Sequence, residues 1–259
     1  MVSTAAILLV KDEADILVST LRWLNDQVDA IYVYDNMSSD GSYEIAKAAG
    51  ATVYRDKEVG YFQSKKTTRL AQKAREAGHS WVVPCDADEL WYSPDGRPLR
   101  DVLAGMPFDV LIHSAAILNF MPTVLDPSIE DVPDPVVRIQ WRLREPAPMP
   151  KVCARTAETL VIHAGNHSAM IGKWKKATPG LLLRHYSWRS PEQYLRKIRN
   201  GIAAYEATDL PDTIGEHWRM WAGQSDESIL EHYARWFSGH DPAENSDLFH
   251  DPLPIEEAV

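Results

Sequence analysis

Three acidic side chains end a short apolar stretch in the first half of the chain. Residues 81–85 are mostly apolar, and Asp86, Asp88 and Glu89 follow. If the stretch is a strand of an open α/β sheet, Asp86 and Asp88 emerge at the edge where ligands bind, and alternate residues point the same way. Carboxylate oxygens suit Mg²⁺ or Mn²⁺, which proteins often bind through one or two carboxylates and substrate phosphates. The sequence predicts a cation or ribose-diphosphate site here; the alternative is a solvated acidic turn.

Another acidic residue, Asp35, directly follows the apolar residues 31–34. A carboxylate at such a strand end can accept hydrogen bonds from a ribose hydroxyl or a base N–H. The alternative is an Asx-turn residue that caps the next helix. Asp40, which precedes a glycine at an expected helix start, is interpreted as a turn residue.

Histidines follow two apolar runs in the second half of the chain. His163 follows residues 160–162, and His185 comes shortly after residues 181–183. Each pattern places an imidazole at the end of a strand, where it is compatible with manganese or zinc. The alternative for His185 is a structural histidine packed on Trp188.

Composition excludes several classes of protein. A chain of 259 residues with 45% hydrophobic content and nine tryptophans can bury a sizeable core, which excludes a disordered protein. The net charge of −10 and the lack of a basic tract argue against a nucleic-acid surface as the main function. Cys85 and Cys153 are expected to be buried thiols in a reducing compartment. Residues 1–10 do not resemble a signal peptide, and no segment approaches the roughly 18 apolar residues of a membrane span, so we expect a cytoplasmic protein.

Apolar stretches alternate with helical patterns over the first part of the chain. This alternation predicts an α/β fold with a mostly parallel, Rossmann-like sheet flanked by helices, and a ligand crevice at the ends of its first, second and fourth strands. The expected strands cover residues 5–10, 31–34, 52–54 and 81–85, and the expected helices cover residues 11–24, 43–49 and 62–77.

The second part of the chain is less regular. Residues 126–135 are acidic and proline-rich, which favours a surface loop that could act as a lid. Apolar residues alternate with arginine and glutamine over residues 137–143, which predicts a half-exposed strand. Its arginine face is expected to be solvated; the alternative is that it contacts an anionic acceptor.

Helices are expected in the C-terminal part. Ser190, Pro191 and Gln193 form a capping box at a helix start. The apolar positions of residues 212–237 predict two further helices packed on the core. Residues 239–259 are acidic and proline-rich and are expected to be a loosely attached tail.

Three segments, in this order, resemble the signatures of family 2-like glycosyltransferases of the GT-A fold. They are residues 10–13 (Val-Lys-Asp-Glu), residues 34–42 (Tyr-Asp-Asn-Met-Ser-Ser-Asp-Gly-Ser) and residues 81–90, which contain Asp-Ala-Asp-Glu. The chain is most similar to the bacterial branch whose metal motif has this last sequence, and the resemblance covers residues 4–92. Residues 36–37 are Asn-Met where Asp-Gly is frequent in the family, a departure that bears on the identity of the base.

The resemblance implies roles for five residues. Val10 and Glu13 would border the base and ribose of a bound nucleotide, and Asp35 would contact the uracil or the ribose. Asp86 and Asp88 would form the DxD motif, in which the second aspartate usually holds the metal most directly; Asp86 would also face the nucleotide.

Basic residues and a histidine complete the implied donor site. Lys65, Lys66 and Arg69 could face the phosphates, with a solvated helix face as the alternative. The resemblance also implies that His185 is a further metal ligand, because GT-A enzymes often take one from a segment C-terminal to DxD.

The general base for the acceptor hydroxyl has no recognisable motif. The candidates are His167, Glu192 and Asp131, in that order, because a base must reach the hydroxyl and have a pKa near the working pH.

The function implied is that of a metal-dependent, hexosyltransferase-like enzyme. It would move a sugar from a nucleotide diphosphate sugar, a UDP-sugar above all, to an acceptor hydroxyl with inversion, using Mn²⁺ or Mg²⁺. Residues 1–189 would be the GT-A catalytic domain, with a nucleotide-binding half (1–92) and an acceptor-binding half (93–189), and residues 190–259 a helical extension and acidic tail. The acceptor could be a glycan, a small molecule, a protein or a modified DNA base, and the oligomeric state is open.

Two other functions are alternatives to this one. A sugar-1-phosphate nucleotidyltransferase normally carries a glycine-rich phosphate loop after its first strand, and residues 11–15 contain no glycine. A non-catalytic nucleotide- or sugar-binding module is the other alternative.

Overall fold

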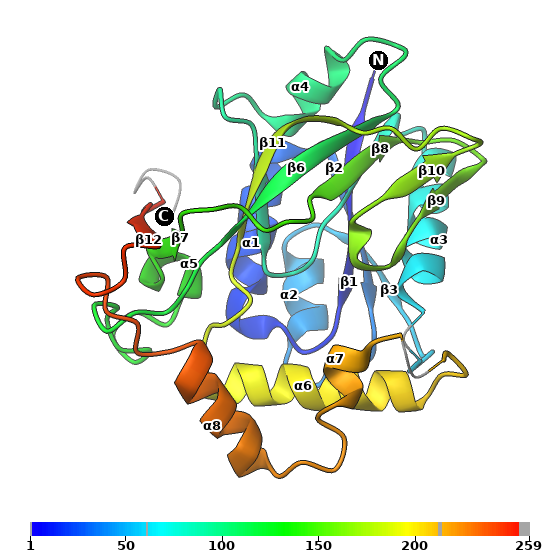
Figure 1. The fold of residues 1–259 in the computed structure, drawn as a ribbon. Coiled ribbons are helices and arrows are strands. Elements are labelled where there is room, and N and C mark those ends of the chain that lie inside the picture. Colours follow the sequence, from blue (N-terminus) through cyan, green and yellow to red (C-terminus); the bar gives the residue numbers. More distant parts are fainter. Residues whose placement is uncertain (1, 61, 212–213, 254–259) are drawn as a thin grey trace. The chain divides into compact units, whose positions relative to one another are not determined.

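A computed structural model of the chain describes residues 2–60, 62–211 and 214–253 (Figure 1). The helices are α1 (Ala14–Gln27), α2 (Ser42–Ala48), α3 (Gln63–Glu76), α4 (Leu99–Ala104), α5 (Pro135–Arg138), α6 (Pro191–Glu206), α7 (Glu216–Arg219), α8 (Asp226–Trp236) and the 3₁₀ helix η1 (Ala164–Asn166). The strands are β1 (Thr4–Val10), β2 (Ala30–Asp35), β3 (Thr52–Arg55), β4 (Trp81–Pro84), β5 (Glu89–Tyr92), β6 (Ile112–Asn119), β7 (Trp141–Leu143), β8 (Lys151–Arg155), β9 (Leu160–Ile162), β10 (Ala169–Ile171), β11 (Thr178–His185) and β12 (Leu248–His250).

The largest sheet within the described residues has eight strands in the order β3-β2-β1-β4-β8-β6-β11-β5. Strands β3, β2, β1 and β4 run parallel to one another. Antiparallel pairs then join β4 to β8, β8 to β6 and β11 to β5. The α/β fold, with a central sheet built on parallel strands and flanked by helices, is confirmed.

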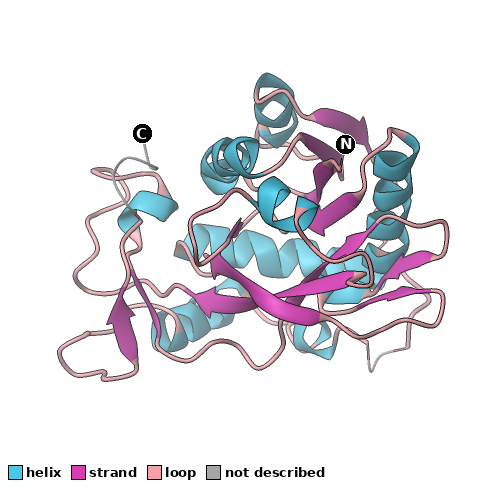
Figure 2. Cartoon of the chain, turned by 90° about the horizontal axis from the view of Figure 1, so that it is seen from above, coloured by secondary structure: helices cyan, strands magenta, loops and turns pink. Residues whose placement is uncertain are grey.

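The two faces of β1 contribute to two different cores. Ala6 and Leu8 pack in one cluster with the apolar face of α1, and Ala5 and Ile7 pack in the other with the apolar face of α3. Helices therefore cover both faces of the parallel strands, which explains why these strands are almost continuously apolar. Figure 2 distinguishes the helices from the strands in a second view. No helix among the described residues is long and apolar enough to cross a membrane.

The chain divides into two compact units. The first comprises Met1–Asp56, Gln63–Leu118 and Pro146–His185 and contains the large sheet. The second comprises Lys57–Phe62, Asn119–Glu145 and Tyr186–Val259. It has its own apolar cluster, in which Tyr194, Ile198 and Ile202 of α6 pack with Ile229 and Tyr233 of α8.

The strand expected over residues 137–143 is wrong in its first half. Pro135–Arg138 forms α5, and the Asp134 carboxylate caps it by accepting the Val136 N–H at 2.9 Å. An aspartate N-cap followed by proline is a strong helix start, and here it overrides the alternating pattern. Arg138 is only 5% exposed and donates to the Arg189 carbonyl at 2.7 Å, so it does not lie on a solvated face.

The loosely attached tail is also a wrong prediction for the part of it that the structure describes. Leu248–His250 forms β12, which pairs antiparallel with β7, and Leu248 is buried. The Arg142 guanidinium binds the Asp251 carboxylate at 2.7 Å. Residues 254–259 of the expected tail lie outside the described residues.

Three smaller predictions concern the capping box of α6, the helices of residues 212–237 and the two cysteines. Ser190 caps α6 by accepting the Gln193 N–H at 3.1 Å, but the Gln193 side chain accepts from the Arg189 N–H at 3.3 Å, so only the first half of the capping box forms. The two helices expected over residues 212–237 are α7 and α8; residues 212–213 lie outside the described residues. Cys85 and Cys153 are buried free thiols, as predicted.

Candidate functional site

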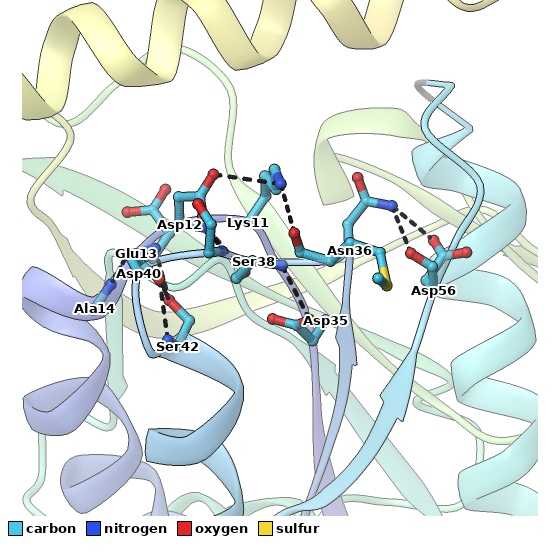
Figure 3. Close-up of polar contacts among 12 residues, drawn as sticks. Lys11, Asp12, Glu13, Ala14, Asp35, Asn36, Ser38, Asp40, Ser42 and Asp56 are labelled. Atoms are coloured by element: carbon cyan, nitrogen blue, oxygen red, sulfur yellow. Dashed lines mark hydrogen bonds and ion pairs between the residues drawn. The ribbon is translucent and has the colours of Figure 1, made fainter.

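The loops that follow β1 and β2 are joined by hydrogen bonds at the carboxyl ends of these strands (Figure 3). Val10 pairs with Asp35 in the parallel register. The Glu13 N–H donates to the Ser42 hydroxyl at 2.9 Å, and the Asp40 carboxylate accepts the Ala14 N–H at 2.9 Å. The structure therefore brings Val10, Glu13 and Asp35 to one edge of the sheet, and the turn role of Asp40 is confirmed.

Asp12 strengthens this junction, although the sequence did not single it out. Its carboxylate accepts the Ser39 N–H at 2.7 Å, and its own N–H donates to the Ser38 hydroxyl at 3.0 Å. Its φ of 54° lies in the left-handed region, which aspartate tolerates better than most residues. The two loops thus have a defined conformation before any ligand binds.

The two carboxylate oxygens of Asp35 lie in different environments. The residue is fully buried, and its Oδ2 accepts from Arg55 Nη1 at 2.7 Å and from the Ser38 N–H at 3.1 Å. Its Oδ1 is buried and has no hydrogen-bond partner among the described residues. The turn interpretation accounts for Oδ2 only. A buried carboxylate oxygen without a donor is costly, so Oδ1 is a favourable place for an N–H or O–H of a ligand.

The basic residues of α3 differ in their surroundings. Lys66 is 7% exposed and forms an ion pair with Asp56 at 2.7 Å. Asp56 follows β3, and its carbonyl accepts from the Asn36 side chain at 3.0 Å. Lys65 and Arg69 are exposed, so their contact with phosphate stays a prediction.

The acidic turn Asp86–Glu89 connects β4 to β5. Glu89 is fully buried, and its Oε2 accepts the Asp86 N–H and the Trp91 indole N–H, both at 3.1 Å. The Thr20 hydroxyl of α1 donates to the Ala87 carbonyl at 2.6 Å. Asp88 is 3% exposed, so a solvated turn describes neither Asp88 nor Glu89.

Two residues that the sequence did not reveal hold Asp86. Lys151 Nζ lies 2.5 Å from Asp86 Oδ2 and 2.9 Å from Glu89 Oε1. The Asn166 amide donates to Asp86 Oδ1 at 3.2 Å. Burial alone would lower the pKa of Lys151, but the adjacent carboxylates of Asp86 and Glu89 outweigh it and hold that pKa above its usual value.

His185 lies beside this turn because β11 pairs antiparallel with β5. The register sets His185 opposite Glu89, and His185 Nε2 lies 3.7 Å from Asp88 Oδ1. Among the described residues no group of three or more His, Cys, Asp or Glu side chains could hold a metal ion. Carboxylate and imidazole nonetheless fit Mn²⁺ or Mg²⁺, which commonly take their remaining ligands from phosphates and water.

The three candidate bases have different surroundings. His167 is half-buried, and its Nδ1–H donates to the Pro150 carbonyl at 2.9 Å. Asp131 is exposed in the second unit and accepts from the Ser128 hydroxyl at 2.8 Å. Glu192, also in the second unit, is exposed in the first turn of α6. Their role as base stays a prediction.

Arg55, Lys151 and Asn166 are the contacts that sequence reasoning missed. Arg55 ends β3 and pairs with Asp35, so the rule that singled out Asp35 at a strand end would have found it too. Lys151 is a single lysine that begins an apolar strand, which is no signal by itself. Asn166 lies between His163 and His167, and an asparagine in such a stretch is no signal by itself.

Comparisons with known proteins give similarities over parts of the chain. No known protein-family profile matches it. A TPR repeat-containing protein of Synechococcus elongatus is 32% identical over 89 residues, which are 34% of this chain and 21% of that protein. The chain thus spans about a fifth of that curated relative.

Solved structures are similar at low sequence identity. Mannosyl-3-phosphoglycerate synthase of Rubrobacter xylanophilus is 18% identical with a TM-score of 0.37, over 60% of this chain and 53% of that one. Glucosyl-3-phosphoglycerate synthase of Mycobacterium tuberculosis in complex with Mn²⁺ and UDP-glucose is 17% identical with a TM-score of 0.34, over 62% and 59%. A mycobacterial protein is 14% identical with a TM-score of 0.39, over 82% and 76%.

Proposed function

We propose that the chain is a metal-dependent glycosyltransferase of the GT-A type. It transfers a sugar from a nucleotide diphosphate sugar, a UDP-sugar, to an acceptor hydroxyl with inversion. One observation supports this proposal. The three segments that resemble the family each include the carboxyl end of a strand, and these strands, β1, β2 and β4, are parallel neighbours. Because the carboxyl ends of such strands meet at one edge, a single ligand there can contact all three segments.

The nucleoside is assigned to the loops after β1 and β2. Asp35 Oδ1 accepts a hydrogen bond from the base or the ribose, while Arg55 holds the other oxygen at 2.7 Å. Val10 and Glu13 border the same place from β1 and from the start of α1. The hydrogen bonds between the two loops keep these groups in position, which lowers the entropic cost of binding.

The diphosphate is assigned to the acidic turn. Asp86, Asp88 and His185 would hold Mn²⁺ or Mg²⁺, and a cation there would supply positive charge to offset the negative charge that develops on the diphosphate leaving group. Lys65 and Arg69 of α3 add positive charge for the phosphates.

The acceptor hydroxyl needs a base that removes its proton. His167 is the first candidate because imidazole is the side chain whose ordinary titration range lies nearest neutrality. Glu192 and Asp131 follow. The acceptor class, whether glycan, small molecule, protein or modified DNA base, is a question for an acceptor screen.

The first experiment is calorimetric binding of UDP, GDP and dTDP, each with Mn²⁺ and with chelator. We expect one nucleotide, UDP, to bind tightly with Mn²⁺, and Asp88→Ala or chelator to weaken that binding about 100-fold or more, because each removes the cation bridge to the diphosphate. Asp95→Ala is the matched control, since Asp95 is an acidic residue of a nearby turn that is exposed and paired with Arg97.

Two outcomes contradict the proposal. If no nucleotide binds under any condition, the donor site is wrongly assigned. If UDP binds equally well with and without metal, and Asp88→Ala changes nothing, the chain is better described as a non-catalytic nucleotide-binding module.

A further inference from the structure

Lys151 is a buried ammonium group that lies between two carboxylates of the acidic turn. It is 5% exposed, and its Nζ lies 2.5 Å from Asp86 Oδ2 and 2.9 Å from Glu89 Oε1. A buried ammonium group is costly unless it is paired and hydrogen-bonded, and here both conditions are met. The acidic turn therefore already contains one tightly held positive charge.

The sheet fixes the position of this lysine. Strand β8 pairs antiparallel with β4, with Trp81 opposite Arg155 and Val82 opposite Ala154. Lys151 is the first residue of β8, four residues before Arg155. On its other side β8 pairs with β6, where Lys151 is opposite Ala115. Lys151 is thus anchored between two strands, and its contact with Asp86 does not depend on a mobile loop.

The second oxygen of Asp86 is also engaged. Asn166 donates to Asp86 Oδ1 at 3.2 Å, and Asn166 itself is 3% exposed. It follows Gly165, and both residues have positive φ values, 75° and 57°. Glycine and asparagine are the residues that tolerate this left-handed region best. Both oxygens of Asp86 are therefore bonded to protein groups.

We propose that the ammonium group of Lys151 is a permanent counter-ion of the acidic turn. It neutralises Asp86 and Glu89, and it thereby sets how tightly a divalent cation can bind there. A metal ion at Asp86 must compete with the ammonium group for Oδ2. Intrinsic affinity for the metal is kept low by this competition, and the phosphates of a bound donor supply the additional ligands. The inference rests on the proposed function only in taking Asp86 as a metal ligand.

The experiment measures Mn²⁺ binding to the full chain without any nucleotide, by the loss of the free-ion EPR signal. It compares the wild type with Lys151→Met, which keeps the length of the side chain and removes its charge, and with Lys151→Arg, which keeps the charge. We expect Lys151→Met to bind Mn²⁺ at least about tenfold more tightly than the wild type, since a nearby positive charge has been removed. Lys151→Arg should bind like the wild type.

A rise in the thermal midpoint on addition of Mn²⁺ provides a second readout. Ligand binding stabilises the folded state, so the rise should be larger for Lys151→Met than for the wild type. If Lys151 had a purely structural role, Lys151→Met would have a lower thermal midpoint, but Mn²⁺ would raise that midpoint no more than it raises that of the wild type. Equal or weaker Mn²⁺ binding by Lys151→Met overturns the inference.

A second pair of variants keeps the test decisive if Lys151→Met does not fold. Removing one partner of a buried ion pair leaves uncompensated charge, and Glu89→Gln reduces that charge. Glu89→Gln with Lys151→Met should bind Mn²⁺ more tightly than Glu89→Gln alone, and equal affinity overturns the inference. Because no nucleotide is present, this result is independent of the UDP experiment, so the two proposals can fail separately.

Discussion

Asp35 combines a structural and a binding feature in one side chain. Its Oδ2 is neutralised by Arg55, whose guanidinium also lies 3.8 Å from the centre of the Tyr43 ring. Its Oδ1 is buried with no hydrogen-bond partner among the described residues. Arg55 thus satisfies one carboxylate oxygen, and the other is left to accept a hydrogen bond from a ligand; hydrogen bonds to charged groups are the stronger ones.

Asp35→Asn tests this assignment. A hydrogen bond to a charged group contributes about 1.5–3 kcal/mol. Replacing the carboxylate should therefore weaken UDP binding roughly 10- to 150-fold, as measured by calorimetry with Mn²⁺ present. The control is Asp95→Asn, whose carboxylate is 49% exposed and should leave the affinity unchanged. An unchanged affinity in Asp35→Asn would mean that the base and ribose bind elsewhere.

Short irregular elements, rather than the long helices, bring side chains to Asp86. The 3₁₀ helix η1 follows β9 and carries Asn166. Its position is fixed by the Gly165 N–H, which donates to the Gln63 side chain of α3 at 2.6 Å, and by the bond from His167 to the Pro150 carbonyl at 2.9 Å. The conformation of this turn therefore determines where Asn166 lies.

Gly165→Ala is the prediction for this element. Gly165 has a φ of 75°, and a Cβ there would lie 2.5 Å from the His167 ring, which cannot move away without straining its bond to Pro150. We expect a loss of about 2–4 kcal/mol in the free energy of unfolding by urea denaturation, from the strained backbone together with the clash.

Gly78→Ala is the matched control, because Gly78 also has a positive φ, 95°, but a Cβ there would meet nothing within 4 Å. It should cost only the backbone strain, about 1–2 kcal/mol. If the two variants lose the same stability, the contact between residue 165 and the His167 ring has no energetic weight.

At the scale of the whole molecule, each compact unit is assembled from separated segments of the chain. The second unit is built from three segments, and β12 near the end of the last pairs with β7 in the middle one. Around this pair Arg142 lies 4.7 Å from the centre of the Phe249 ring, and the Trp141 and His250 rings are 4.8 Å apart. Residues 248–251 are thus a structural part of the second unit.

Truncation after Ser246 should therefore destabilise the protein. Loss of the buried Leu248 alone corresponds to about 2 kcal/mol, and each kcal/mol lowers the midpoint of thermal unfolding by about 2–4 °C in a protein of this size. We expect a decrease of at least about 4 °C relative to a chain truncated after Leu253, so that the comparison isolates residues 247–253. Equal midpoints would show that β12 contributes nothing to stability.

The sequence by itself determined the α/β fold and the residues at the carboxyl ends of the parallel strands. Both can be recognised from the local sequence. A strand in a parallel sheet is buried on both faces, so its sequence is a run of apolar residues, and the polar residue that ends this run marks the edge of the sheet where ligands bind. Asp35 and Asp86 were found in this way, whereas Val10 was implied by the family resemblance alone. The assignment of Asp40 to a turn was local as well, and it is confirmed.

Local patterns were less successful where a competing local signal or a distant contact decides the structure. Residues 137–143 alternate as a strand would, yet the Asp134 cap and Pro135 start a helix that buries Arg138. Residues 248–251 look like a tail, yet β7, more than a hundred residues earlier in the sequence, pairs with them. Neither the amino-acid composition of a segment nor its short-range periodicity indicates which distant strand will pair with it.

Only the tertiary structure decided what surrounds the acidic turn. Lys151 reaches Asp86 because β8 pairs antiparallel with β4, Asn166 reaches it from η1, and His185 lies beside Asp88 because β11 pairs with β5. Strand order and register are set by the packing of the whole sheet, and they bring together residues that no spacing in the sequence relates. The charged groups around the acidic turn are therefore brought together by the pairing of the strands, whereas the residues that end the parallel strands can be identified from the sequence.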